Sequence, residues 1–202
     1  MLTFRHTRHG PRAALRRARG VTLIETLIAL GLTAIVMMIA VPDFSQWMAN
    51  SRIRGAAESI QDGLRFARAE AVRLNTPVRF QITSTASDWT VCLPAAAGET
   101  DCNGGTVLGS HSANEGAIGI TTGGYTGGGN PYATPAAAGT PNGTTFTSLG
   151  WAGAAGDLAR VDITNGALAA PRWMVVNISA SGQISMCDPS PLVATSNPLH
   201  CE

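Results

Sequence analysis

The sequence predicts an α+β protein in which a long N-terminal helix packs, through its second half, on a C-terminal antiparallel β-sheet domain. Three observations predict this fold. Residues 21–41 form one apolar segment, an amphipathic segment then continues to residue 74, and short β-like segments separated by turn residues follow from residue 78. With 202 residues, the chain has room for one ordinary domain and an appendage.

The composition describes a folded chain and excludes several enzyme classes. Charged residues make up 13% and hydrophobic residues 45%, a balance that argues against disorder. All 14 basic residues are Arg, which excludes P-loop NTPases of the GxxxxGK[ST] type, Schiff-base lysine chemistry and protein kinases. The G-x-S-x-G, H-E-x-x-H and G-x-G-x-x-G patterns are also absent. We therefore expect no catalytic residues, no cofactor and no enzymatic activity.

The first element is a basic leader, residues 1–20, followed by an apolar helix. The leader has no acidic residue and contains Arg5, Arg8, Arg12, Arg16, Arg17 and Arg19. The apolar segment 21–41 carries one charge, Glu25, and as a helix it would reach roughly 30 Å, the thickness of a bilayer core. Arginines before the segment place the N-terminus in the cytoplasm and the rest of the chain outside. We therefore expect residues 21–42 to span the inner membrane once.

Three interpretations of this segment compete. A cleaved secretory signal has a shorter apolar core and an A-x-A-like cleavage site, whereas Pro42-Asp43-Phe44 follows here. An ordinary single-span anchor leaves Glu25 without explanation, because a carboxylate within the hydrocarbon is costly and usually marks function. The third interpretation uses the whole order of residues: a basic leader, Gly20, V-T-L-I-E, an apolar helix and Pro42.

This order resembles the type IV prepilins and the type II secretion pseudopilins. The resemblance rests on the G-x-T-L-x-E spacing after a basic leader, and one departure is Val21 where the family usually has Phe. It implies that a prepilin peptidase cuts after Gly20, that Val21 is N-methylated and that Glu25 is the fifth mature residue. Pro42 becomes the twenty-second, where many pilins carry a proline, and we expect a helix kink there.

Glu25 has a physical role that fits this resemblance. Cleavage creates a cationic amine on Val21, and a carboxylate in the apolar layer can neutralise the amine of a neighbouring subunit, where a low dielectric strengthens the attraction. Paired between subunits, the two charges would set the register of filament assembly. The alternative is a Glu25 side chain that snorkels to the cytoplasmic interface.

The second half of the helix, residues 43–75, is amphipathic. Apolar residues recur at steps of three and four, which predicts a packing face: Ile53, Ala56, Ala57, Ile60, Leu64, Ala67, Ala71 and Leu74. Three pairs at helical spacing, Arg54–Glu58, Asp62–Arg65 and Glu70–Arg73, are expected to attract weakly. Pro77 ends the helix near Asn75.

Residues 76–202 form the β-rich head. We predict strands at 78–82, 89–93, 145–149, 159–163, 173–178 and 183–186, and a tight turn at Ser181-Gly182. Residues 95–144 read as long surface loops, with edge strands near Thr106–Leu108 and Ala117–Thr121. Large aromatics are expected in the core or anchoring loops: Trp89, Phe146, Trp151 and Trp173.

Within the pilin-like proteins the chain resembles the GspH/FimT family of minor pilins and minor pseudopilins. The residues that carry the resemblance are RGVTLIETLIAL (19–30), NSRIRGAAESIQDGLRFARAEAVRLNTPVRF (50–80) and SGQISMCDPS (181–190). It implies a minor pilin that assists type IV pilus assembly, or alternatively a minor pseudopilin of a type II secretion system. The implied partners are the prepilin peptidase and other pilins or pseudopilins, with the head in the periplasm.

The four cysteines lie in the head, where export favours disulfides. Four cysteines allow three pairings, and we expect the local one, Cys92–Cys102 and Cys187–Cys201, because it closes two short loops. A metal site is the alternative, but there is no CxxC, and only His111 and His200 lie beyond the leader.

A DNA-binding minor pilin of natural transformation is the remaining alternative. Some members of the family bind DNA through a C-terminal G-R-x-R pattern, and the matching stretch at 182–185 is Gly-Gln-Ile-Ser, without either arginine. From residue 79 onward the chain has three Arg against eight acidic residues. Arg160 and Arg172 are the candidates for a weak DNA contact, and we expect DNA binding to be weak or absent.

Overall fold

The computed structural model describes residues 20–96, 98–112, 120–126, 132, 134–136, 142–153, 156–166, 172–190 and 193–201. At residues 39–43, 120 and 125 it describes the backbone alone. The chain divides into two compact units, Met1–Pro42 and Asp43–Glu202. The predicted leader, residues 1–20, lies outside the described residues except for Gly20.

Helix α1 (Leu23–Leu74) runs through both units, as the sequence predicts. It ends where the backbone of Asn75 turns left-handed, with a φ of 52°, and the Thr76 N–H reaches the Ala71 carbonyl at 3.3 Å. The Asn75 N–H bonds to the Val72 carbonyl at 3.4 Å, so the two bonds form a Schellman cap. The predicted end near Asn75 is confirmed.

The predicted kink and the last four residues of the predicted membrane span fall on residues whose backbone alone is described. α1 continues through position 42, but the side chains of residues 39–43 lie outside the described residues, and the kink at Pro42 stays a prediction. Among the described residues, no helix combines the length and the apolar character needed to cross a membrane.

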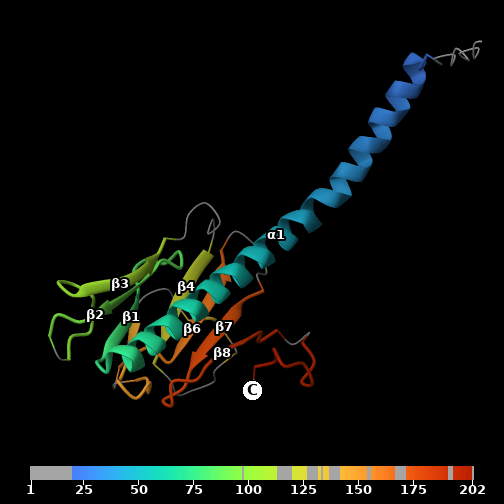
Figure 1. Ribbon diagram of the computed structural model, residues 1–202. Coiled ribbons are helices and arrows are strands. Elements are labelled where there is room, and N and C mark those ends of the chain that lie inside the picture. Colours follow the sequence, from blue (N-terminus) through green and yellow to red (C-terminus); the bar gives the residue numbers. More distant parts are fainter. Residues whose placement is uncertain are drawn as a thin grey trace, which may run out of the picture. The chain divides into compact units, whose positions relative to one another are not determined.

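The head contains two four-stranded antiparallel sheets, where the sequence predicted one (Figure 1). The first has the order β3-β2-β1-β5 and comprises β1 (Val78–Ile82), β2 (Trp89–Leu93), β3 (Thr106–His111) and β5 (Gly143–Phe146). The second has the order β4-β6-β7-β8 and comprises β4 (Ile120–Tyr125), β6 (Arg160–Asn165), β7 (Met174–Ile178) and β8 (Ile184–Cys187). The predicted fold class, a long helix packed on an antiparallel β domain, is confirmed. The division of that domain into two sheets was not predicted, because periodicity locates strands but does not say which edges pair.

The strand positions are close to those predicted. β1 and β2 have the predicted bounds, and β3 forms the edge strand predicted near Thr106–Leu108. β4, also at a sheet edge, begins at Ile120 and overlaps only the end of the strand predicted near Ala117–Thr121, whose residues 117–119 lie outside the described residues. β5 is shifted from the predicted 145–149 to Gly143–Phe146, because Gly150 turns the chain with a φ of 77° and the Gly150 N–H bonds to the Thr147 carbonyl. The predicted turn between β7 and β8 is confirmed by a Gly182 N–H to Ser179 carbonyl bond of 2.8 Å.

The core lies between the sheets and the second half of α1, which passes across the strands in Figure 1. The predicted packing face is confirmed, since seven of its residues are at most 9% exposed: Ile53, Ala56, Ala57, Ile60, Leu64, Ala67 and Ala71. Gly63 permits the close approach, because a Cβ there would lie 2.7 Å from the Trp89 ring. The Trp89 indole N–H also bonds to the Ser59 hydroxyl at 3.1 Å.

The Trp151 side chain is 60% exposed, so the prediction that it packs in the core or anchors a loop was wrong.

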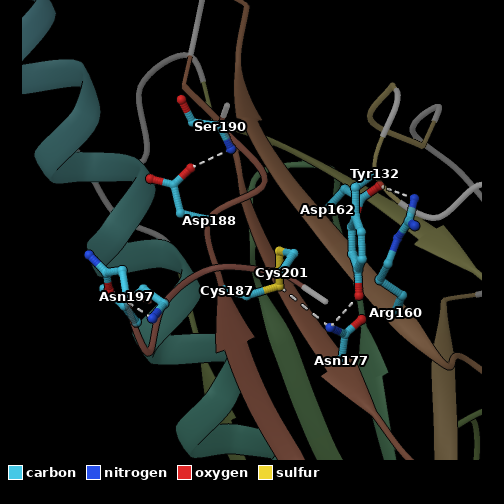
Figure 2. Close-up of a disulfide and its surroundings, with 10 residues drawn as sticks. Tyr132, Arg160, Asp162, Asn177, Cys187, Asp188, Ser190, Asn197 and Cys201 are labelled. Atoms are coloured by element: carbon cyan, nitrogen blue, oxygen red, sulfur yellow. Dashed lines mark hydrogen bonds and ion pairs between the residues drawn. A yellow bond between two sulfur atoms is a disulfide. The ribbon is translucent and has the colours of Figure 1, made fainter. Parts of the chain in front are cut away.

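Both expected disulfides are present, Cys92–Cys102 and Cys187–Cys201. The first ties β2 to the loop before β3, where the Cys102 N–H bonds to the Gln81 side-chain oxygen at 2.7 Å. The second holds the C-terminal tail beside the end of β8 (Figure 2). The Asp188 N–H there bonds to the Leu199 carbonyl at 2.6 Å. The tail is therefore part of the folded head.

Candidate functional site

The predicted cleavage point lies at an open, exposed stretch of chain. Gly20 and Val21 are both exposed and precede the first helical residue. A Cβ placed on Gly20 would meet no described atom within 4 Å, so packing against the described residues does not require glycine there.

Thr22 and Glu25 form the start of α1. The Thr22 side-chain oxygen accepts the Glu25 backbone N–H at 3.3 Å, and the T-x-x-E spacing is that of a capping box. This cap was not among the features predicted from the sequence, although the T-x-x-E spacing alone indicates it. The Glu25 side chain is exposed and makes no hydrogen bond or ion pair with any described residue. Its carboxylate is therefore available to a partner.

The helix around Glu25 is apolar and exposed on every side. Large apolar side chains between residues 21 and 38 are 56–84% exposed, including neighbours in sequence such as Leu27 and Ile28. A helix that is apolar all round is normally buried, in a protein core or in a membrane. Residues 21–38 therefore expose an apolar surface that the described residues do not bury.

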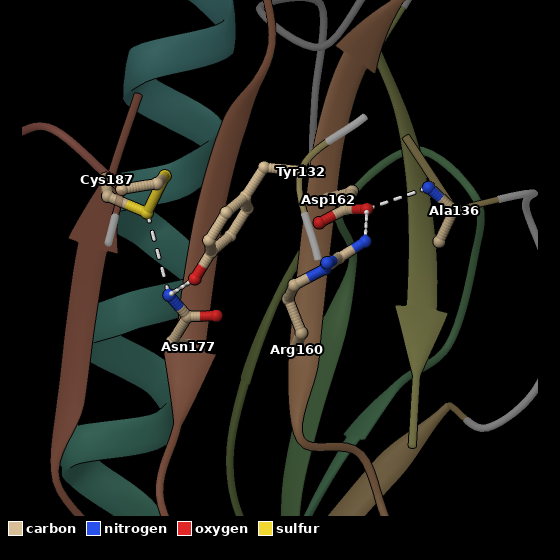
Figure 3. A network of polar contacts seen from close by, with 7 residues as sticks. Tyr132, Ala136, Arg160, Asp162, Asn177 and Cys187 are labelled. Carbon is tan, nitrogen blue, oxygen red and sulfur yellow. Dashed lines mark hydrogen bonds and ion pairs between the residues drawn. A yellow bond between two sulfur atoms is a disulfide. The ribbon is translucent and has the colours of Figure 1, made fainter. Parts of the chain in front are cut away.

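Arg160, one of the two candidate DNA contacts, is buried in a polar network on β6. Its side chain is 6% exposed, and its guanidinium bonds to the Asp162 carboxylate at 2.7 Å. The Ala136 N–H donates to the same carboxylate oxygen at 2.7 Å (Figure 3). Arg160 also lies over the Tyr132 ring, 5.5 Å from its centre. It is therefore neither a surface charge nor a phosphate contact, and its assignment as a DNA-contact candidate was wrong.

The same network reaches the C-terminal disulfide. The side-chain amide of Asn177, opposite Arg160 in the sheet register, donates to the Tyr132 hydroxyl at 3.0 Å and lies 3.6 Å from the Cys187 sulfur. Figure 3 shows the Tyr132 ring between Asn177 and Arg160. Val175, Cys187 and Cys201 form a second small apolar cluster, against which Tyr132 and Trp173 pack. This face of the second sheet is thus covered.

Burial affects the charge of this network. It raises the pKa of the Asp162 carboxyl, and the hydrogen bonds from Ala136 and Arg160 act in the opposite direction. Burial is the larger effect, so the network holds a carboxylate that is costly to keep ionised.

Arg172 and Arg79 are also paired. Arg172, the second candidate DNA contact, is half exposed and bonds to the Asp188 carboxylate at 2.7 Å. Arg79 is 4% exposed on β1 and pairs with Asp157 at 3.2 Å. The buried Arg79–Asp157 pair was not predicted from the sequence, because its members are 78 residues apart.

Of the pairs predicted on the helix, Asp62–Arg65 and Glu70–Arg73 form, whereas Arg54 and Glu58 make no ion pair among the described residues.

The described residues contain no cluster of three or more His, Cys, Asp or Glu side chains that could hold a metal ion. The four cysteines form the two disulfides and have no free thiol.

Two family models match the chain in complementary regions. The prokaryotic N-terminal methylation motif matches residues 15–41, and the model described as type II transport protein GspH matches residues 56–182. The chain belongs to the GspH family. Its members are minor pilins and pseudopilins, which are structural subunits of filaments.

The type II secretion system protein H of Xanthomonas campestris pv. campestris is 31% identical over 74 residues, which are 37% of this chain and 44% of that protein. The match thus spans less than half of that relative.

Solved structures with a related shape include the type IV minor pilin FimU of Pseudomonas aeruginosa. It has 17% identity and a TM-score of 0.45, and the match covers 67% of this chain and 88% of FimU. The minor pseudopilin EpsH from the type 2 secretion system of Vibrio cholerae has 12% identity and a TM-score of 0.45, with 68% and 98% covered.

Proposed function

We propose that this GspH-family chain is a minor, non-enzymatic subunit of a type IV pilus or of a related pseudopilus. In this proposal a prepilin peptidase cuts after Gly20, Val21 is N-methylated, residues 21–42 anchor the subunit in the inner membrane, and the head lies in the periplasm. Assembly then packs the apolar helix against other pilins or pseudopilins.

The observation that carries the proposal is the contrast between the two parts of α1. Residues 53–71 bury their apolar face against the head, whereas the apolar side chains of residues 21–38 are exposed on every side. The one carboxylate in that exposed part, Glu25, has no partner among the described residues. An all-round apolar helix with one unpaired carboxylate is suited to a bilayer and then to a bundle of identical or related helices.

The methylation motif supports the processing step, because its match at residues 15–41 spans Gly20, Val21 and Glu25. Removal of residues 1–20 takes away six arginines and leaves eight basic against 13 acidic residues, a net charge of −5. N-terminal sequencing of the chain recovered from membranes should therefore begin at Val21. A Gly20→Leu variant should remain uncut, and a mature chain that begins near residue 45 would refute the proposal.

Two filaments are candidates. The resemblance of the sequence to minor pilins favours a type IV pilus, whereas the description of the family model and the Xanthomonas relative favour the pseudopilus of a type II secretion system. Deletion of the gene should abolish surface pili in the first case and export of secreted enzymes in the second. Complementation with the wild-type chain should restore the lost function, and a deletion strain that keeps both functions would contradict both candidates.

A further inference from the structure

A cleft of about 280 Å³ lies in the unit Asp43–Glu202, between α1 and the strand ends of the second sheet. Trp47, Asn50 and Arg54 line it from α1, and Arg172, Met174 and Asp188 line it from the sheet side. The three helix residues lie at steps of three and four, so they share one face of α1. The functions considered above make no use of this cleft.

The cleft has a surplus of positive charge and of hydrogen-bond donors. Arg54 is exposed and makes no ion pair or hydrogen bond with any described residue. Arg172 uses one nitrogen, Nη2, to bond to Asp188, and the other oxygen of that carboxylate accepts the Ser190 N–H at 2.9 Å. The lining therefore includes two guanidinium groups and one carboxylate, whose two oxygens are both engaged. Guanidinium groups bind phosphate through paired N–H donors.

Trp47 gives the cleft an aromatic wall, and Phe44, which does not line the cleft, lies beside Trp47 on α1. Trp47 is 66% exposed and Phe44 60%, and their ring centres lie 5.9 Å apart. Trp47 follows Pro42 by only five residues, about 8 Å along a helix. Tryptophan is enriched at membrane interfaces, where its ring lies at the level of the lipid headgroups. Exposed aromatics at this distance from an apolar helix therefore indicate contact with lipid.

Asn50 lines the cleft beside Trp47 and Arg54. The cleft thus combines guanidinium donors for a phosphate with an apolar aromatic wall.

We propose that this cleft binds the headgroup of an anionic phospholipid such as phosphatidylglycerol. Its phosphate would lie between Arg54 and Arg172, and the upper part of its acyl chains against Trp47. The inference rests on the proposed membrane anchor. DNA offers the same phosphate, but it lacks an acyl chain for the aromatic wall and would face a head with three Arg against eight acidic residues from residue 79 onward. The bound lipid would hold the head at the membrane surface until assembly extracts the subunit.

The test uses the processed full-length chain in detergent, with equimolar phosphatidylglycerol and phosphatidylcholine added and retained lipid counted by native mass spectrometry. The wild-type chain should retain phosphatidylglycerol preferentially. Arg54→Gln should lower the preference about fivefold, the effect of one basic residue at an anionic membrane surface. Arg54 has no partner among the described residues, so the variant leaves the fold intact. Arg172→Gln should act in the same direction.

Arg52→Gln is the matched control, because Arg52 lies two residues from Arg54 on α1 and does not line the cleft. It should leave the preference unchanged. An equal loss in both variants would indicate general attraction to negative charge and would overturn the site, as would an Arg54→Gln variant with wild-type preference. Displacement of the lipid by an equal concentration of inorganic phosphate or of duplex DNA would overturn the lipid assignment.

Flotation with vesicles of the two lipids separates this inference from the proposed function. A wild-type chain that fails to float would overturn the membrane anchor and the lipid site together. A chain that floats but shows no effect of Arg54→Gln on lipid retention would overturn the lipid site alone.

Discussion

Replacing Glu25 with Gln should prevent assembly while leaving the subunit folded. The Glu25 side chain makes no hydrogen bond or ion pair with a described residue. Within the chain the variant therefore loses only the attraction between the carboxylate and the helix dipole in the first turn of α1, worth about 0.3–1 kcal/mol. In a filament the carboxylate would face the Val21 amine of a neighbour. At about 4 Å and an effective dielectric of about 20, that attraction is about 4 kcal/mol.

Loss of this attraction should measurably lower incorporation of the subunit into filaments. A free energy of about 4 kcal/mol corresponds to nearly a thousandfold in an equilibrium constant, so even half of it would lower incorporation by more than tenfold. The assay compares the amount of the chain in sheared filaments with the amount in the inner membrane. Glu25→Gln should be cut at Gly20 and inserted normally, and should accumulate in the membrane.

Two control variants separate charge pairing from other roles of this residue. Thr22→Val removes the oxygen that caps α1 and should cost about 1 kcal/mol of helix stability without blocking assembly. Glu58→Gln removes another exposed helix carboxylate and should have no effect. Wild-type incorporation of Glu25→Gln would refute the pairing argument. Equal losses in Glu25→Gln and Thr22→Val would assign Glu25 to capping instead.

Three further predictions concern the head, as a fragment of residues 43–202. Loss of the Cys187–Cys201 bridge in a double Ala variant should lower the free energy of unfolding in urea by about 3 kcal/mol, from the entropy of a loop of that length; a loss below about 1 kcal/mol would contradict this. Burial raises the pKa of the Asp162 carboxyl above its ordinary 3.8, so between the unfolded-state and folded-state pKa values the folded state binds more protons than the unfolded state. The advantage of the wild type over Asp162→Asn in free energy of unfolding should therefore shrink as the pH rises through this interval. An advantage that grew with pH would show that the Arg160 ion pair dominates instead. Finally, since Arg160 is buried and Arg172 is paired, the head should bind duplex DNA no tighter than about 10⁻⁴ M at physiological salt, and micromolar binding that weakens with salt would refute this.

The sequence by itself determined the long helix, its packing face and the two disulfides. The helix was predictable because its apolar residues recur at one period from Ile53 to Leu74, and that face meets one core. The bridges were predictable because each joins cysteines 10 or 14 residues apart, within short loops. The motif from Gly20 to Glu25 could be identified from the sequence because its residues are close together in the chain.

Only the tertiary structure decided the division into two sheets and the state of the head's arginines. Along β6 the residues Arg160 to Thr164 alternate polar and apolar, a pattern that favours one solvent-exposed face. That face is covered instead, because the segment with Tyr132 and Ala136 and the disulfide-held tail lie over the second sheet. The cleft between Arg54 and Arg172 likewise joins residues more than a hundred positions apart. Periodicity describes each element from its own residues, whereas burial depends on which distant segments cover it.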